Sequence, residues 1–561
     1  MSANSPTIGF CPSFAQAPED TLDDPCHAEG SITDGLSVST KKPEREFSTG
    51  VDMVIPRCSG RIEIRSFEPG IQGHFPQDKQ TAETALMFLQ LTCYAAAVKQ
   101  KEIDSQAQQH FQDKLLSCWL ALAAAVSVSL PSSPALAGNW PAWRGAEGSG
   151  ICRETNLPLR WSTNENVRWC VALPDRGNST PIIWREQIFI TQAIENRRTV
   201  MCLNRRTGAL LWQAGPTWTR PEQAPPDNPS CTPSPVTDGG RVIAWFGSAG
   251  VYCYNLRGRE LWHRDLGRQS HMWGYAATPV LDANLCFVNF GPGERSFLVA
   301  LDKRTGKTVW QYDVPRYGTG MKWSDLGGKD RAGEPTVVET AGSWATPLIV
   351  PAGRQNELVV PFAGRLMAFE PGTGALLWAC DGPNIGVYSS PFFGDGVVAL
   401  NASGTTNTLL AVRPGGRGDV TETHRLWIQR PGNNKTCLGA GVIHNGHIYQ
   451  VNMMGFAECR ELQTGRTVWE ERLTGTGARN ASWSAPVLAG DRLYLPNKNA
   501  DVFVLRASPS FECLTTNSIG GEPMNASLAA SEGEIFIRTD KHLWCVGEQR
   551  NKSRSQGTLT Q

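Results

Sequence analysis

Short apolar runs separated by polar turns follow one another along most of this chain, and one pattern of them keeps returning. In the copy that begins at Ala300, an apolar run ends at Asp302, a Thr305-Gly306 pair follows, and a second run closes on Trp310. Short runs bounded by turn residues predict β-strands, since apolar helices are usually longer. A pattern that returns about every 40 to 50 residues predicts a repeat architecture such as a propeller.

Further copies of the pattern differ mainly in the length of the turn. They occupy residues 202–212, 368–378 and 459–469, with a shortened copy at 253–262 and a copy with a longer turn at 411–427. Each repeat can be laid out as four strands, A to D from the inside outward, with the Trp on strand D. Strand A opens with a small residue and Pro, as in Thr180-Pro181, and proline is tolerated at the first residue of a strand.

The count of D strands decides the architecture. No D-like strand follows the last C strand at 543–546, but a spare one lies before the first A strand, at 166–173. The strands of every kind number eight only if this N-terminal strand completes the last repeat, which closes a ring and removes its open edge. We therefore predict an all-β fold, an eight-bladed β-propeller over 138–548, followed by a polar tail at 549–561.

The Ala-x-Asp-x-x-Thr-Gly-x-x-x-Trp pattern resembles the repeat of the quinoprotein (PQQ-like) propellers, and the resemblance covers essentially all of the chain after residue 137. The segment 139–150, which opens Asn-Trp-Pro-Ala-Trp-Arg-Gly, resembles the leader of bacterial exported PQQ-like repeat proteins. Those proteins are often likened to the propeller lipoprotein of the outer-membrane β-barrel assembly machinery.

The resemblance also implies a structural role for the repeated Trp, which docks flat between neighbouring blades. That role falls on Trp212, Trp262, Trp310, Trp378, Trp427 and Trp469. The copy around Trp427 and the copy at Phe511, the weak D position of blade 7, depart from the pattern. We therefore expect blades 5 and 7 to pack less regularly than the others.

The region before the repeats divides into two parts. Residues 1–113 are polar and share nothing with the repeat, so they read as a disordered extension or as the product of a misassigned translation start. Residues 114–137 join a basic residue, an apolar run at 115–130 and a small-residue site ending at Ala137, which is the pattern of a signal peptide. We expect export to the periplasm or the extracellular space with cleavage after Ala137; the alternative is a membrane anchor formed by 115–130.

Charge and motif content narrow the function classes. The 53 basic and 53 acidic side chains balance, so nothing in the net charge favours nucleic acid as a partner. The alcohol dehydrogenases that the resemblance brings in carry adjacent cysteines over PQQ, with Ca²⁺ beside it. This chain has no adjacent cysteines and no Cys-x-x-Cys-His sequence. We expect no cofactor, no metal and no catalytic residue, with PQQ and calcium as the alternative.

The cysteines and histidines fit structural roles better than chemical ones. Four cysteines share one strand-C position beside the docked Trp, where a small buried residue is needed: Cys202, Cys253, Cys459 and Cys545. Three others, Cys152, Cys231 and Cys437, fall in connections and are freer to form a disulfide. The pair His444 and His447 flanks Asn-Gly, which predicts a hairpin turn and not a metal site.

One face of the predicted ring carries the connections from strand D to the next strand A, which vary most in length. They include 215–233, 267–277 and 313–343, and binding residues gather on such loops. Three residues before the A-strand Pro stands an aromatic residue in three repeats, Trp344, Tyr388 and Trp483, and Asn178 holds the same place in a fourth. We predict that these four side chains rim the channel mouth and meet a ligand or partner; the alternative is a second packed aromatic ring under the loops.

Together these patterns favour a monomeric binding or scaffold module of the bacterial cell envelope, with outer-membrane protein assembly as one setting. The expected partner is an envelope protein or a small ligand at the channel mouth, without nucleic acid and without an integral membrane domain unless the signal segment is retained. Two alternatives remain open, a PQQ-dependent quinoprotein dehydrogenase and a periplasmic ligand sensor.

Overall fold

The computed structural model describes residues 138–548, apart from 221, 223, 270, 272, 294, 316–341, 384–385, 403–406, 432–435 and 478–480. All described residues belong to one compact unit, which lies within Ala124–Gln561. The N-terminal extension, the predicted signal peptide and the C-terminal tail lie outside the described residues. No helix within the described ranges is long and apolar enough to cross a membrane.

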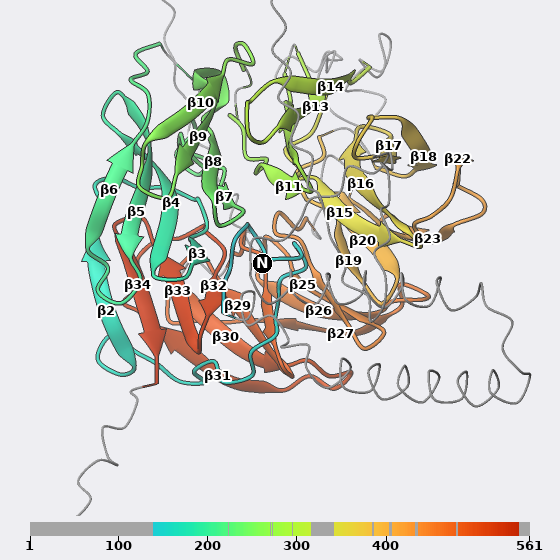
Figure 1. Ribbon diagram of the computed structural model, residues 1–561. Coiled ribbons are helices and arrows are strands. Elements are labelled where there is room, and N and C mark those ends of the chain that lie inside the picture. The colour runs from blue at the N-terminus through green and yellow to red at the C-terminus, as the bar shows by residue number, and fades with distance from the viewer. Residues whose placement is uncertain are drawn as a thin grey trace, which may run out of the picture. The chain divides into compact units, whose positions relative to one another are not determined.

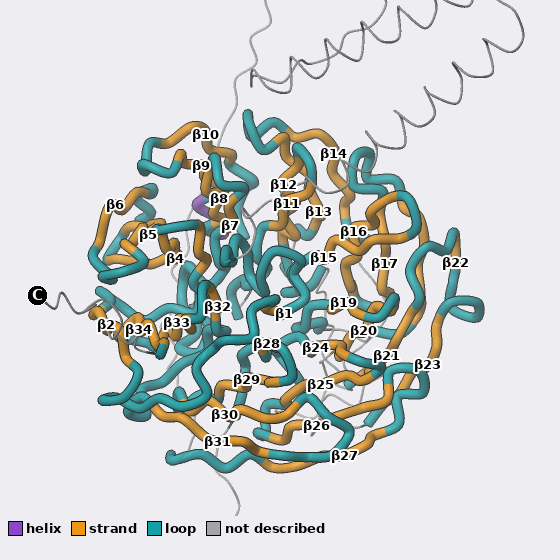
Figure 2. Tube along the Cα trace, turned by 60° about the horizontal axis from the view of Figure 1, so that its bottom comes forward, coloured by secondary structure: helices purple, strands orange, loops and turns teal. Residues whose placement is uncertain are grey.

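Eight antiparallel sheets surround a common centre, which confirms the predicted eight-bladed propeller. The chain forms them because its apolar runs are short and β-branched residues and aromatics fill them, with Gly turns between. In Figure 2 the first strand of each blade lies innermost, around the channel. The structure has one short 3₁₀ turn, η1 (Gly247–Ala249), among the described residues.

The strands of the first four blades follow one another along the chain. Blade 1 consists of β3 (Ile182–Trp184), β4 (Gln187–Ile194), β5 (Arg197–Asn204) and β6 (Leu210–Ala214). Blade 2 consists of β7 (Val236–Thr237), β8 (Arg241–Trp245), β9 (Val251–Asn255) and β10 (Glu260–Arg264). Blade 3 consists of β11 (Val280–Asp282), β12 (Leu285–Phe290), β13 (Phe297–Asp302) and β14 (Thr308–Asp313). Blade 4 consists of β15 (Leu348–Ala352), β16 (Gln355–Phe362), β17 (Arg365–Phe369) and β18 (Leu376–Asp381).

The later blades include the strand that closes the ring. Blade 5 consists of β19 (Phe392–Gly394), β20 (Val397–Ala402), β21 (Thr408–Val412) and β23 (Arg425–Gln429). Blade 6 consists of β24 (Val442–His444), β25 (His447–Val451), β26 (Phe456–Glu461) and β27 (Thr467–Arg472). Blade 7 consists of β28 (Val487–Ala489), β29 (Arg492–Pro496), β30 (Asp501–Arg506) and β31 (Cys513–Ser518). Blade 8 consists of β32 (Ala529–Ser531), β33 (Glu534–Arg538), β34 (His542–Gly547) and β2 (Val167–Ala172). Two short strands add parallel edges, β1 (Ile151–Cys152) on β28 and β22 (Gly418–Asp419) on β18.

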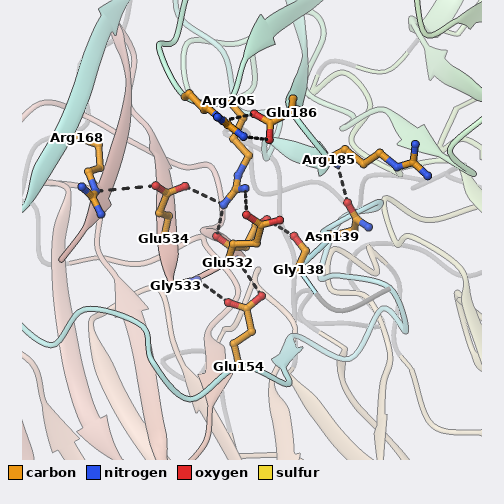
Figure 3. A network of polar contacts seen from close by, with 12 residues as sticks. Gly138, Asn139, Glu154, Arg168, Arg185, Glu186, Arg205, Glu532, Gly533 and Glu534 are labelled. Carbon is orange, nitrogen blue, oxygen red and sulfur yellow. Dashed lines mark hydrogen bonds and ion pairs between the residues drawn. The ribbon is translucent and has the colours of Figure 1, made fainter. Parts of the chain in front are cut away.

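The N-terminal strand β2 supplies the outer strand of blade 8, as the sequence predicts. It pairs antiparallel with β34, with Val171 opposite Leu543, so strands from the two ends of the described chain lie side by side (Figure 1). The junction with blade 1 is further held by Arg205, whose guanidinium contacts the carboxylates of Glu532 and Glu534 on the A–B hairpin of blade 8 (Figure 3). Glu154 accepts hydrogen bonds from the backbone N–H groups of that same hairpin.

The hydrophobic core lies between the blades. One cluster joins side chains of blades 2 and 3, another joins blades 4 and 5, and a third joins blades 6 and 7. Because both faces of a blade are covered by its neighbours, the middle strands are mostly apolar, and every residue of β20 and β21 is buried. The outer strands alternate instead, as in β14, where exposed and half-buried residues take turns.

The Thr-Gly turn of one blade meets the Trp of the preceding blade wherever both are present. Trp310 donates its indole N–H to the carbonyl of Pro371 in the next blade, at 2.8 Å. Gly374 of that turn has φ +73, and a Cβ there would lie 2.5 Å from the Trp310 ring. The glycine is therefore required twice, by its left-handed backbone and by the ring packed on it. The same N–H bond to the following blade is made by Trp169, Trp212, Trp262, Trp427 and Trp469.

The expected irregularity of blade 5 arises in its C–D connection. Trp427 itself docks as expected and makes the regular bond, to the carbonyl of Leu462. The departure is at Trp378, which donates to the buried carboxylate of Glu357 at 2.7 Å. The reason is that the long C–D connection of blade 5 offers Trp378 no Thr-Gly turn and places β22 beside it instead.

The proposed D position of blade 7 at Phe511 is wrong. In blade 7 Thr515 stands opposite Val504, which is the register that the Trp has in the other blades. Phe511 precedes β31, is 37% exposed and packs its ring edge-on against Trp469, 5.2 Å between centroids. Phe511 thus packs near the junction, although it lies outside the strand.

The predicted strand-C cysteines hold the position assigned to them, since Cys202, Cys253, Cys459 and Cys545 pair with Trp212, Trp262, Trp469 and Trp169. Cys152, Cys231 and Cys437 are buried and form no disulfide, and Cys152 lies in β1 and not in a connection. His444 and His447 flank the β24–β25 turn, in which Asn445 has φ 50 and Gly446 has φ 72, so the hairpin prediction is confirmed.

Candidate binding site

A cavity of about 460 Å³ opens at the channel mouth on the face that carries the D–A passages. We call it the D–A cavity. Its volume is within the range of about 300–1,000 Å³ that is usual for ligand pockets. The structure brings all four predicted rim residues, Asn178, Trp344, Tyr388 and Trp483, to this one cavity.

The inner wall of the cavity is a belt of hydroxyl side chains, one from the start of strand A in each of six blades. Each hydroxyl oxygen accepts the backbone N–H of the equivalent residue in the preceding blade, at 2.8 to 3.2 Å. These residues, which we call the hydroxyl belt, are Thr180, Ser234, Thr278, Thr346, Ser390 and Ser527. The belt is built by the small residue that precedes the A-strand Pro, or by its counterpart Ser527 in blade 8.

The belt is interrupted at blades 6 and 7, where Ala440 and Ala485 carry no hydroxyl. At blade 6, Arg144 of the leader segment 139–150 lies beside this gap. Its guanidinium donates to the carbonyls of Ala440 and Gly441 at 3.0 and 2.6 Å, and also to Ser149 at 2.5 Å. Burial lowers the pKa of the Arg144 guanidinium to about 9.

The leader also forms the inner end of the D–A cavity. Trp143 lies in that wall and donates its indole N–H to Ser527 of the belt at 3.4 Å. The same Trp143 lines a second cavity of about 670 Å³, whose other walls are the leader and the A–B turns of blades 2 to 5. The leader therefore divides the channel into two chambers, one open at each face.

Four aromatic rings pack into one wall of the D–A cavity. Trp344 is 8% exposed, and its indole N–H donates to the carbonyl of Gly274 at 3.0 Å. Tyr388 lies 5.0 Å from it and His271 4.7 Å, between ring centroids. Trp273 completes the wall at 5.5 Å from Tyr388 and is 47% exposed. Burial raises the pKa of Tyr388 to about 12, so its hydroxyl stays protonated at neutral pH.

The opposite wall is Trp483, with the ammonium group of Lys498 4.0 Å from its ring centroid. Lys498 also pairs with Asp227 at 2.8 Å. The carbonyl of Asp227 accepts hydrogen bonds from the side-chain amides of Asn178 and Asn525, at 2.8 and 3.2 Å. The segment 225–228 thus ties the passages leading into blades 1, 2 and 8 to blade 7 at the mouth of the cavity.

A family model described as the outer membrane protein assembly factor BamB matches residues 160–291 and 294–554, which is most of the chain. The chain belongs to this family. No curated protein matches it closely enough to count as a relative.

Solved structures of similar form come from several kinds of protein. BamB from Moraxella catarrhalis is 14% identical, with a TM-score of 0.48, and the match covers 69% of this chain and 99% of that one. A europium-containing methanol dehydrogenase is 11% identical, with a TM-score of 0.45 and coverage of 75% and 99%. The computationally designed Ika8 protein is 12% identical, with a TM-score of 0.41 and coverage of 67% and 100%.

The D–A cavity does not suit PQQ, the cofactor that the quinoprotein resemblance brings in. PQQ carries several carboxylate groups, and carboxylates are held by guanidinium or ammonium donors. Among the described lining residues the ionisable groups are the Asp227 carboxylate and the Tyr388 hydroxyl, and neither is a cation. The described residues also contain no group of three or more His, Cys, Asp or Glu that could hold a metal ion.

Several residues of the cavity were not singled out from the sequence. The hydroxyl belt was visible as repeated Thr-Pro and Ser-Pro pairs, but these were interpreted as strand starts alone. Trp143 gave no signal, because nothing local shows that a leader enters the channel. Trp273 lies five residues before the next belt residue, Thr278, whereas Trp344 and Tyr388 lie two residues before theirs. Most of the predicted loop 313–343 lies outside the described residues.

Proposed function

We propose that this protein is a binding module of the bacterial cell envelope that holds a segment of a partner protein in the D–A cavity. The observation that carries the proposal is the cavity itself, which is concave, of ligand-pocket volume and walled by aromatic rings on two sides. Tryptophan and tyrosine are the residues most enriched where partners bind tightly. Membership of the BamB family supports a role in outer-membrane protein assembly as the setting.

The chemistry of the lining supports binding more than turnover. General acid–base catalysis needs a titratable side chain within hydrogen-bond reach of the reacting group. The described lining offers two, Asp227 and Tyr388. The Asp227 carboxylate is already paired with Lys498 at 2.8 Å, and burial raises the pKa of Tyr388 to about 12, far from neutral pH. The remaining polar groups are hydroxyls, amides and indole N–H groups, which orient a bound molecule without exchanging protons with it.

A capture experiment tests the proposal. The purified protein would be fixed to a support and exposed to solubilised envelope of its own host, and the captured proteins would be identified by mass spectrometry. The comparison is between the wild type, Trp483→Ala and Tyr388→Ala. The control is Leu261→Ala, a 41% exposed apolar residue on the outer strand of blade 2. We expect one partner whose capture falls at least about tenfold in both cavity variants and is unchanged in the control.

Two results would contradict the proposal. One is a partner that all four proteins capture equally, because the cavity would then take no part. The other is dye-linked alcohol or sugar oxidation after PQQ and Ca²⁺ are added to the purified protein, which would favour the dehydrogenase alternative. Melting temperatures of all variants, measured alongside, distinguish loss of binding from loss of folding.

The proposed location in the envelope can be tested separately. We expect the mature chain to begin after Ala137 and residues 1–113 to be absent from it. Peptide mapping of protein taken from the native envelope decides this, and peptides from 1–113 in the exported product would contradict it.

A further inference from the structure

The D–A cavity presents many hydrogen-bond donors with no acceptor in the protein. Each oxygen of the hydroxyl belt accepts a backbone N–H, but no described carbonyl or carboxylate accepts the proton of any belt hydroxyl. A hydroxyl has one proton to donate in addition to the bonds that it accepts. Six donors therefore face the channel.

The aromatic walls add donors of the same kind. Trp344 donates its indole N–H to the carbonyl of Gly274, and Trp143 donates its own to the hydroxyl of Ser527. Trp273, Tyr388 and Trp483 line the cavity too, and among the described residues none of these three donates its N–H or O–H. Indole N–H groups and hydroxyls that are partly withdrawn from water usually have a hydrogen-bond partner.

Acceptors are fewer, and the side-chain amide oxygens among them are those of Asn178, Asn228 and Asn525. The Asp227 carboxylate is paired with Lys498, and the Asp227 carbonyl is already taken by Asn178 and Asn525. The side-chain oxygen of Asn525 is buried without a partner. The cavity therefore has an excess of neutral donors beside flat apolar rings, and its one lining charge is neutralised.

This balance discriminates between classes of ligand. An anion would supply acceptors, but it would leave water for a lining without a free cation, at a high desolvation cost. An oligosaccharide, or a peptide with ordinary N–H groups, brings about as many donors as acceptors, and its donors would be buried without partners. Proline residues bring a carbonyl acceptor and a flat apolar ring and no N–H.

Resting on the proposed function, we propose that the D–A cavity binds an extended, proline-rich segment of the partner protein. In such a segment the polyproline II conformation is already formed, so little chain entropy is lost on binding. Its rings pack on Trp273, Tyr388 and Trp483, and its carbonyls accept from those side chains and from the hydroxyl belt. Proline-rich segments are recognised elsewhere by aromatic-lined grooves on the same physical grounds.

The test uses the purified propeller and three defined probes: an oligoproline peptide blocked at both ends, a Gly–Ser peptide of equal length blocked likewise, and a neutral N-acetylglucosamine oligomer. Binding is followed by tryptophan fluorescence and by calorimetry. We expect the oligoproline peptide to bind at least about tenfold more tightly than either other probe. Tighter binding of the oligosaccharide, or equal binding of the two peptides, overturns the proposal.

Matched variants then locate the donors. Tyr388→Phe and Trp483→Phe keep an aromatic ring and remove one donor each, so oligoproline affinity should fall about two- to tenfold in each. Tyr252→Phe, a half-buried tyrosine of β9 outside the cavity, should bind like the wild type. Unchanged affinity in both cavity variants overturns the assignment of the donors and the proposal with it.

The outcomes also separate this inference from the proposed function. If oligoproline does not bind while cavity variants still abolish capture of the partner, the ligand class is wrong and the binding function stands. If oligoproline binds as expected while capture is indifferent to the cavity, the cavity recognises proline but the proposed function is wrong.

Discussion

Arg144 is a buried side chain that joins the leader to blade 6 inside the ring. It is 3% exposed and fully enclosed by backbone carbonyls of the leader and of blade 6. A buried guanidinium is tolerated when its donors are satisfied, and several charge-assisted bonds here offset the loss of hydration. The residue lies at the gap that Ala440 leaves in the hydroxyl belt and joins the leader to the start of strand A in blade 6.

Replacing Arg144 by methionine should therefore lower the stability of the whole propeller. Four hydrogen bonds disappear and the carbonyls of Ala440 and Gly441 are left buried without donors, at a cost of about 3 kcal/mol. The melting temperature and the urea midpoint measure the loss. Arg153→Met is the control, because the Arg153 side chain is 83% exposed and its ion pair with Glu147 contributes little. Equal stability of the two variants would show that Arg144 is dispensable.

The predicted rim residues differ in what holds them, and their substitutions should differ accordingly. Trp344 is packed on three rings and hydrogen-bonded, so Trp344→Ala should cost about 3–5 kcal/mol of folding free energy. Trp483 is half-buried with a cation over one face, so Trp483→Ala should cost clearly less. Denaturant unfolding of both variants tests the order. A reversed order would mean that Trp483, and not Trp344, is the structural residue of the pair.

For single residues, the sequence predicts where a side chain lies in the ring better than it predicts which side chains it contacts. The spacing from the A-strand Pro placed Trp344, Tyr388 and Trp483 correctly around one channel, because the repeat fixes where each passage turns inward. It did not show that Trp344 is packed, since His271 and Trp273 come from a different passage. Contacts between loops of unequal length depend on tertiary packing, which a local pattern does not encode.

The element that carries the repeat is the C–D turn, in which an acidic or amide side chain accepts hydrogen bonds from the backbone N–H groups that follow. Asp302 accepts from the N–H of Thr305 at 2.8 Å and from its hydroxyl at 2.8 Å. Asn204 and Asn255 fill the same position in blades 1 and 2. The pattern was read correctly from the sequence because every interaction that forms the turn is local. The D position predicted at Phe511 is wrong because blade 7 lacks the local turn pattern, so its register depends on strand pairing.

Glycine in this turn should be irreplaceable for a reason beyond its backbone. Gly306 and Gly446 have nearly the same φ, +71 and +72, but a Cβ at Gly306 would lie 2.5 Å from Trp262, whereas Gly446 faces open space. Gly446→Ala should cost about 1–2 kcal/mol from backbone strain alone. Gly306→Ala should lose about 1–3 kcal/mol more, because Trp262 must move. Equal losses in thermal unfolding would refute the role of the ring.

The same turn gives the propeller a dependence on acid. The hydroxyl of Thr305 lowers the pKa of the Asp302 carboxyl, and the corresponding threonines lower those of Glu370 and Glu461. A carboxyl whose folded pKa is lowered adds stability above its unfolded pKa of about 4, and that stability is lost as the pH falls through the folded value. Asp302→Asn should keep the turn, as Asn204 does, and its stability should approach that of the wild type as the pH falls below about 4. Unfolding curves from pH 7 to pH 2 measure this, with Glu165→Gln, outside any such turn, as the control.

At the scale of the whole molecule, the main feature is the closure of the ring at blade 8. Strand β2 covers the edge of β34, and Arg205 and Glu154 hold the hairpin of blade 8 from either side. Closure could be predicted from the sequence because the strand count required it. The path of residues 139–150 into the channel could not, because a segment without periodic apolar positions gives no indication of where it packs.

Removing residues 138–173 should destabilise every blade together. The deletion exposes the edge of β34, leaves the core around Trp140 and Leu157 open and removes Arg144 from blade 6. We expect a large drop in melting temperature and association through the exposed edge, visible in light scattering. Deleting the tail 549–561 is the control. A truncated chain that melts like the intact one would contradict the closed ring.

The leader also sets the order in which this protein can finish folding. Gly138 is contacted by Ser531, 393 residues later in the chain, and Ile151 pairs with Leu488. A chain emerges from synthesis with its N-terminal end first, so the segment that fills the channel appears long before the blades that receive it. Blades 1 to 7 can each form from neighbouring residues, whereas the leader and β2 must wait, unpaired, until blade 8 has arrived. The final step is therefore a single long-range docking event, slow by its contact order, during which the apolar leader is open to proteases and chaperones.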